Sequence, residues 1–203
     1  MKPVMFSKEV PVLVVDDLYD ELELLTIWEE LQFLTSPKRM HNPFYLGAAR
    51  NESGEFNKNA NGVFLDEFYA KRISSNILEV NRKLFSKEIK DMALQISIFY
   101  KLLEEINNDI TLINYYEDAQ SYAAHTDSTV FTAITTLYRE PVQFSGGDLD
   151  FPELELTIEK RNNRMVLFPG ALLHAATPVV MNEKNHSYSG YGRYSMVQFL
   201  RII

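Results

Sequence analysis

The chain has 203 residues, 46% of them hydrophobic and 24% charged, which is the composition of a globular protein rather than a disordered or fibrous one. Its 20 basic and 28 acidic residues give a formal net charge of −8, and no cluster of Lys or Arg stands out, so we expect no nucleic-acid partner and no membrane partner. There is no cysteine, no N-terminal signal-peptide pattern and no apolar stretch of about 18 residues, so we expect a cytoplasmic protein without disulfides.

The N-terminal part of the chain predicts a strand, a helix and a long loop. The apolar, β-branched run VPVLVV at 10–15 is typical of a buried strand. Asp16 and Asp17 then offer a helix N-cap, and apolar residues recur at helical spacing over 18–34, where a Ser-Pro sequence ends the helix. Residues 35–62 are rich in Asn, Gly and Pro and predict a long loop with at most one strand, which is either a functional segment or a solvated connector.

Two further amphipathic helices are predicted, at 66–85 and 87–107. The apolar face of the first is formed by Ile73, Ile77, Val80 and Leu84, and that of the second by Ile89, Met92, Ile96, Phe99, Leu103 and Ile106. Both faces are expected to pack against the core, and neither indicates a cofactor site.

The rest of the chain predicts strands. Short segments rich in β-branched and aromatic residues alternate with turn signals such as SGGD and FPG; they are ITLINYY, TVFTAITTLY, LDFPELELTI, RMVLF and RYSMVQFLRII. Helices followed by strands predict an α+β protein, and about five to seven strands in so short a stretch favour a sandwich or jelly roll. We expect one domain over 1–203, with helical support mainly in 16–107 and the β core mainly in 110–203.

One short motif carries metal chemistry. In the sequence HTD, His125 and Asp127 are two residues apart, so in a strand their side chains would leave on the same face. An imidazole and a carboxylate on one face form two thirds of the facial site that holds non-haem Fe(II). His174 follows the segment RMVLF and a Phe-Pro-Gly turn, and a strand pairing could place it beside His125. Taken singly, a histidine at a strand end is more often structural, and a His-x-Asp pair often arises by chance.

Several motifs in order give the chain a resemblance to a known family. The segments YYEDAQSYAAHTDS, TTLYRE, SGGDLDF, RMVLFPG, HAATPV and RYSMVQFL, spread over roughly 111–203, are similar to those of iron(II)/2-oxoglutarate-dependent dioxygenases of the prolyl 4-hydroxylase-like family. VLVVDDLYDELELL also resembles the strand and helix that open that family. The resemblance implies a double-stranded β-helix, or jelly-roll, core with N-terminal flanking helices.

Matched residue by residue, the resemblance makes His125, Asp127 and His174 the iron ligands. Arg193 would pair with the distal carboxylate of 2-oxoglutarate through two parallel hydrogen bonds, and Tyr116 and Ser195 would be secondary contacts to that carboxylate. Two neighbouring glycines match the family's Gly-Gly turn, for which we favour a purely structural role.

The basic residue departs from the family's spacing. It usually lies about ten positions after the second histidine, where this chain has Lys184, whereas Arg193 lies further on. We favour Arg193, because RYSMVQFL matches the strand that follows the basic residue in the family, and NEKNHSYSGYG is then an insertion. His186 in the same loop is a rival metal ligand that a polar loop would hold less rigidly. His41 is expected in a surface loop.

The implied chemistry is hydroxylation of an unactivated C–H bond, with Fe(II), 2-oxoglutarate and O2, release of succinate and CO2, and ascorbate as a reductant. Relatives that halogenate lack the carboxylate ligand, so the presence of Asp127 favours hydroxylation. The substrate is a prolyl or other residue of a peptide or protein, or alternatively a free amino acid or small metabolite. A non-catalytic metal-binding jelly-roll sensor is a further alternative. Nothing in the sequence indicates the oligomeric state.

Overall fold

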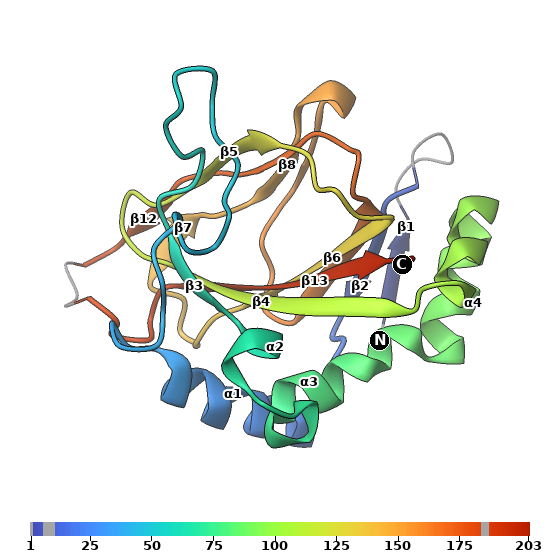
Figure 1. Ribbon diagram of the computed structural model, residues 1–203, viewed down its shortest axis with the longest axis horizontal. Coiled ribbons are helices and arrows are strands. Elements are labelled where there is room, and N and C mark those ends of the chain that lie inside the picture. Colours follow the sequence, from blue (N-terminus) through green and yellow to red (C-terminus); the bar gives the residue numbers. More distant parts are fainter. Residues whose placement is uncertain (1, 6–10, 184–186) are drawn as a thin grey trace.

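The computed structural model describes residues 2–5, 11–183 and 187–203 (Figure 1). Its main feature is a pair of antiparallel sheets that face each other, with helices covering the outer face of the larger sheet (Figure 1). One cluster of buried apolar residues lies between the helices and the large sheet, and a second lies between the sheets. This arrangement is the double-stranded β-helix, or jelly roll, that the sequence predicts.

The large sheet has seven strands in the order β1-β2-β10-β6-β13-β4-β3. Its strands are β1 (Lys2–Met5), β2 (Leu13–Asp16), β3 (Asn61–Phe64), β4 (Asn108–Tyr116), β6 (Phe131–Leu137), β10 (Arg164–Pro169) and β13 (Arg193–Arg201). In β13, alternate residues face opposite layers. Tyr194, Met196 and Leu200 pack in the cluster beneath the helices, whereas Val197 and Phe199 belong to the cluster between the sheets.

Two smaller sheets complete the β core. The four-stranded sheet has the order β5-β11-β8-β9, formed by β5 (Tyr122–His125), β11 (His174–Ala176), β8 (Leu149–Phe151) and β9 (Leu156–Ile158). The remaining pair is β7 (Phe144–Gly146) with β12 (Val179–Met181).

The helices are shorter than the sequence predicts. They comprise α1 (Glu21–Leu34), α2 (Leu65–Phe68), α3 (Asn76–Val80) and α4 (Lys87–Ile96), with 3-10 turns η1 (Arg72–Ser74), η2 (Asn81–Phe85), η3 (Ile98–Glu104) and η4 (Pro152–Leu154). Over the described ranges, no helix is both long and apolar enough to cross a membrane.

The prediction of continuous helices at 66–85 and 87–107 is wrong. Ser75 and Ser97 each adopt extended backbone within a predicted helix, and their side chains accept hydrogen bonds from N–H groups two or three residues ahead. Each serine therefore starts a new helical turn instead of continuing the last one. As a result Ile73, predicted to face the core, is 83% exposed, while Ile77, Ile89 and Leu103 are buried as predicted.

The predicted start of the first helix is also wrong. The N-cap is Asp20, which forms a capping box with Glu23, rather than Asp16 or Asp17. The Asp16 carboxylate instead accepts hydrogen bonds from Arg164 at 2.6 and 2.9 Å and so joins β2 to β10.

Two predicted β segments change in detail. The segment 149–158 is two strands, β8 and β9, because η4 and a left-handed Glu155 form a turn between them. Within 10–15, strand β2 begins only at Leu13, and Val10 lies outside the described residues. The segment 35–62 is largely irregular, as expected, and enters β3 at Asn61.

Candidate metal centre

His125 and Asp127 converge, although not in one strand as we predicted. Strand β5 ends at His125, and Asp127 follows in the connection to β6. The Asp127 backbone N–H donates to the Gly170 carbonyl at 2.8 Å, and the Thr132 hydroxyl donates to the Asp127 carboxylate at 2.7 Å. These two bonds, rather than strand alternation, fix the direction of the carboxylate.

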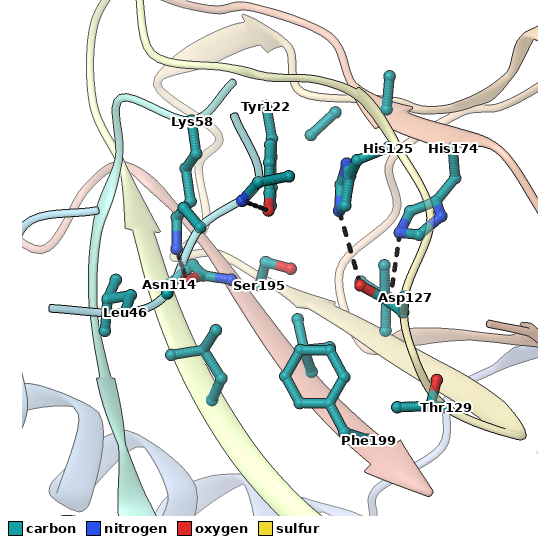
Figure 2. A pocket seen from close by; sticks show the side chains of 18 of the residues that line it. Leu46, Lys58, Asn114, Tyr122, His125, Asp127, Thr129, His174, Ser195 and Phe199 are labelled. Carbon is teal, nitrogen blue, oxygen red and sulfur yellow. Dashed lines mark hydrogen bonds and ion pairs between the residues drawn. The ribbon is translucent and has the colours of Figure 1, made fainter. Parts of the chain in front are cut away.

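His174 lies beside His125, as the sequence predicts. It opens β11, which pairs antiparallel with β5 so that His174 and His125 are register partners. The two rings have centroids 4.3 Å apart. Asp127 reaches between them, with oxygen atoms 3.8 Å from His125 Nε2 and 3.5 Å from His174 Nε2 (Figure 2).

Hydrogen bonds set both histidines in the tautomer that a metal requires. His125 Nδ1 lies 2.9 Å from the Ala123 carbonyl, and His174 Nδ1 lies 2.9 Å from the Leu172 carbonyl. Because a carbonyl oxygen only accepts, Nδ1 carries a proton in each ring, and in the neutral form of the ring Nε2 keeps its lone pair for a metal. This second hydrogen bond is the one that metal-ligating histidines commonly make.

The surroundings keep His125 neutral. The ring of Tyr122 stacks on it with centroids 3.6 Å apart, and burial, followed by the nearby His174, lowers the pKa of His125 to about 4. The Phe168 ring packs against His174 with centroids 4.8 Å apart. At neutral pH His125 is therefore already in the form that binds a metal.

The three residues fit one divalent transition metal. Their ligand atoms all lie within 4.8 Å of one another. Ligand atoms about 2.1 Å from one ion are roughly 3 to 3.6 Å apart at octahedral to tetrahedral angles, so a slight inward movement completes the site. Two imidazoles and one carboxylate on a single side match the facial arrangement of non-haem Fe(II) sites and leave further positions open.

The ligands open onto a cavity of about 320 Å³ between the two sheets (Figure 2). Alternate residues of β13 line its floor, from Arg193 and Ser195 to Val197, Phe199 and Arg201. Strand β4 adds Leu112, Asn114 and Tyr116 by the same alternation. Residues 46–49 and Lys58, from the long segment before β3, complete the lining.

Arg193 is a buried cation with unused hydrogen-bond donors. It is 1% exposed, its Nη2 donates to Thr136 Oγ1 at 3.2 Å, and Nε and Nη1 have no hydrogen-bond partner in the part of the chain that the structure describes. Burial lowers its pKa, an effect that the nearby Tyr116 and Asp148 oppose. Because buried donors are nearly always paired, this guanidinium is suited to an anion that enters the cavity.

Two further predicted residues share this cavity with Arg193. Tyr116 is the register partner of Arg193, and its ring centroid lies 5.3 Å from the guanidinium carbon. Ser195 is the next inward residue of β13 and lines the same cavity. Gly147, with φ +74°, packs against Arg193, because a Cβ there would lie 2.7 Å from the Arg193 Cδ, which agrees with a structural role for the Gly-Gly turn.

The remaining candidates lie elsewhere. His41 is exposed on the surface, bridged to Gly62, and is not among the residues that line the cavity. Lys184 and His186 lie outside the described residues.

Sequence reasoning missed four cavity or supporting residues: Lys58, Asn114, Tyr122 and Thr132. Alternation along ITLINYY could have revealed Asn114, since it lies two residues before Tyr116. No local signal distinguishes Lys58 from a solvated lysine in a polar loop.

Comparison with known proteins agrees with this geometry. Residues 111–201 match the family described as the 2OG-Fe(II) oxygenase superfamily, whereas no curated protein matches the chain. A Pseudomonas putida prolyl-4-hydroxylase has a similar structure, with 13% identity, a TM-score of 0.61, and coverage of 96% of this chain and 94% of that one. A Trichoplax adhaerens prolyl hydroxylase, solved with a hypoxia-inducible-factor peptide fragment, has 11% identity and a TM-score of 0.60, with coverage of 95% of this chain and 84% of that one.

A viral collagen prolyl hydroxylase from Paramecium Bursaria Chlorella virus-1, solved as a 2OG complex, gives 15% identity and a TM-score of 0.53, with coverage of 93% and 94%. At such identities the likeness shows the fold alone. The matched family segment contains the ligand trio and the residues on β4 and β13 that line the cavity. Residues 111–201 are therefore similar in sequence to the 2OG-Fe(II) oxygenase superfamily, and the chain is similar in fold to these prolyl hydroxylases.

Proposed function

We propose that this protein is an Fe(II)- and 2-oxoglutarate-dependent dioxygenase that hydroxylates an unactivated C–H bond in a residue of a peptide or protein. The reaction consumes O2 and 2-oxoglutarate and releases succinate and CO2, so that one oxygen atom enters the substrate and the other enters succinate. The observation that carries the proposal is the buried guanidinium of Arg193, with two donors unpartnered among the described residues, in the same cavity as the ligand trio.

His125 and His174 would bind Fe(II) through Nε2, and Asp127 through its carboxylate. When bound, the iron and 2-oxoglutarate supply the activation of dioxygen and the oxidation of the C–H bond. Thr132 would hold the Asp127 carboxylate toward the ion, since it already donates to Oδ2 at 2.7 Å. Tyr122, stacked on His125, excludes water from one side of that ring.

Arg193 would bind the distal carboxylate of 2-oxoglutarate. Its Nε and Nη1 atoms have no partner among the described residues, and either one together with the remaining N–H of Nη2 forms a planar fork that suits two parallel, charge-assisted hydrogen bonds. Tyr116 and Ser195 would add hydroxyl contacts, because both line the cavity near this end of β13. Val197 and Phe199, further along the same face, would form the dry wall beside the reacting carbon.

A peptidyl substrate is supported by the structurally similar Trichoplax enzyme, which was solved with a peptide fragment. The size of the cavity is equally compatible with the alternative substrate, a free amino acid or small metabolite. Its volume of about 320 Å³ is at the lower end of the range of ligand pockets, with room beside the cosubstrate for one side chain or one small molecule.

The experiment is a measurement of succinate formed from 2-oxoglutarate with Fe(II), oxygen and ascorbate, without added substrate. We expect slow, uncoupled succinate production by the wild type and by His41→Ala, whose histidine lies outside the cavity, and none by Asp127→Ala. A wild-type protein that binds Fe(II) but forms no succinate would instead be a sensor.

A further inference from the structure

Lys58 occupies an unusual position for a lysine in an asparagine-rich loop. Its backbone forms an antiparallel bridge with Tyr122 of β5. On one side Asn57 donates its side-chain amide to the Ala124 carbonyl, and on the other Asn59 accepts a bond from the Ser121 N–H at 2.7 Å. Lys58 is therefore fixed against the strand that carries His125, and binding a ligand would require little further ordering.

The Lys58 side chain points into the cavity rather than into solvent (Figure 2). The residue is 2% exposed, and its ammonium group donates to the Asn114 Oδ1. An ammonium group has three donors, so two are left after this bond. Among the described residues, no carboxylate lies within ion-pair distance of Lys58, and its Nζ is 5.8 Å from the centre of the Tyr122 ring.

The charges that line the cavity are unbalanced. Its lining includes Lys58, Arg193 and Arg201, whereas Asp127 is the one acidic residue among the described residues that line it. On the proposed function, Fe(II) and Arg193 together neutralise the two carboxylates of 2-oxoglutarate and that of Asp127. Among the described residues Lys58, which is buried, then has no counter-charge, and a charge in a buried site needs one.

We propose that the substrate of this dioxygenase carries a carboxylate and that Lys58 binds it. This inference rests on the proposed function and narrows its substrate class to acids. The carboxylate would lie beside Tyr122 and Asn114, across the cavity from the ligand trio, and would direct the neighbouring carbon toward the metal. Two sources are compatible with this chemistry: an acidic side chain of a peptide, or a free small acid.

The electrostatics around Lys58 agree with this role. Burial lowers the pKa of Lys58 to about 7, so near neutral pH an anion beside Lys58 would favour its ammonium form over the neutral amine. A purely structural lysine, present only to orient Asn114, would give the same contact without any preference for acids.

The test is a binding measurement on protein loaded with Mn(II) and an inert 2-oxoglutarate analogue. One arm uses N-acetylated amino acids and their primary amides. The other uses capped peptides that differ only in Asp against Asn, or Glu against Gln. In one of the two arms, we expect the acid of a matched pair to bind about ten-fold tighter than its amide. The arm that shows this preference identifies whether the carboxylate belongs to a small acid or to a peptide side chain. In Lys58→Met the preference for the acid over its amide should fall below about two-fold, whereas Lys38→Met, which changes an exposed lysine, should keep the wild-type preference.

An acid preference that survives Lys58→Met, or no preference in either arm, overturns the inference. So does weaker binding of the 2-oxoglutarate analogue itself in Lys58→Met with no change in the acid-to-amide ratio, because Lys58 would then serve the cosubstrate. If Lys58→Met does not fold, Lys58→Gln gives the same readout, since its amide can still donate to Asn114. Succinate formation by the wild type is measured in parallel. Its absence overturns the proposed function, whereas succinate without acid preference overturns only this inference.

Discussion

The cavity has two walls that are built in different ways. The residues that we propose for metal and cosubstrate binding lie on or directly beside strands β4, β5, β11 and β13, where antiparallel register places His174 opposite His125 and Arg193 opposite Tyr116. The opposite wall comes from the irregular segment 35–62, which is positioned by isolated bridges and asparagine side chains. The strand wall is thus suited to invariant chemistry, and the loop wall to choosing the substrate, because loops tolerate sequence change more readily than paired strands.

The largest effect is expected from breaking the strand wall at the metal. Asp127→Ala removes the one anionic ligand, so we expect the affinity for Fe(II) or Mn(II) to fall more than about 100-fold and succinate formation to stop, with the circular dichroism spectrum unchanged. His174→Ala should behave alike, and His41→Ala is the matched control. Decarboxylation of 2-oxoglutarate at the wild-type rate in Asp127→Ala would remove the basis for assigning this site.

The next effect concerns the cosubstrate end of the same wall. Arg193→Ala deletes the guanidinium whose Nε and Nη1 have no partner among the described residues, and we expect the Kd for 2-oxoglutarate to rise about 100-fold. Lys184→Ala should change it less than about two-fold. Calorimetric titration in the presence of Mn(II) compares the two variants, and the reverse order would show that the insertion before β13 was placed wrongly.

A smaller effect separates ligands from the residues that position them. Thr132→Val keeps the shape of the side chain but removes the hydroxyl that donates to Asp127, so we expect metal affinity to fall about ten-fold. Thr135→Val, on the opposite face of β6, is the control and should keep wild-type affinity. An unchanged affinity in Thr132→Val would mean that the Gly170 bond alone orients Asp127.

The two walls should also differ in how pH affects stability. Burial lowers the folded-state pKa of His125 from 6.5 to about 4 and that of Lys58 from 10.5 to about 7. Between the folded-state and the unfolded-state pKa of each group, the unfolded chain binds more protons than the folded protein. The free energy of unfolding therefore rises with pH across that range and falls as the pH is lowered. Urea unfolding of the metal-free protein should show His125→Gln flattening the window from about 4 to 6.5, and Lys58→Met flattening that from 7 to 10.5. Parallel curves for wild type and variant in the assigned window would contradict the burial of that group.

Sequence alone indicated the strand wall because its signals are local. The alternation in RYSMVQFLRII, the HTD motif and the FPG turn before His174 each reflect strand geometry, and antiparallel pairing of β5 with β11 then unites the ligands. The fold class followed from the same periodicity. The exact geometry of Asp127 did not, because it depends on the distant Thr132 hydroxyl and Gly170 carbonyl.

The loop wall was beyond sequence reasoning for a physical reason. The burial of Lys58 depends on a bridge to Tyr122, 64 positions away in the chain, and nothing in the polar segment around it indicates that pairing. The helix breaks at Ser75 and Ser97 were missed because the apolar spacing continues across them, and only the serine caps interrupt the backbone. Long-range pairing and capping chemistry therefore account for most of the differences.

A crystal structure with Mn(II) and an inert 2-oxoglutarate analogue tests the central claim most directly. We expect the ion to be bound by Nε2 of His125 and His174 and by the Asp127 carboxylate, with the distal carboxylate of the analogue on Arg193. An ion held by other residues, or an analogue whose distal carboxylate lies on Lys184 or Lys58 instead of Arg193, would contradict it.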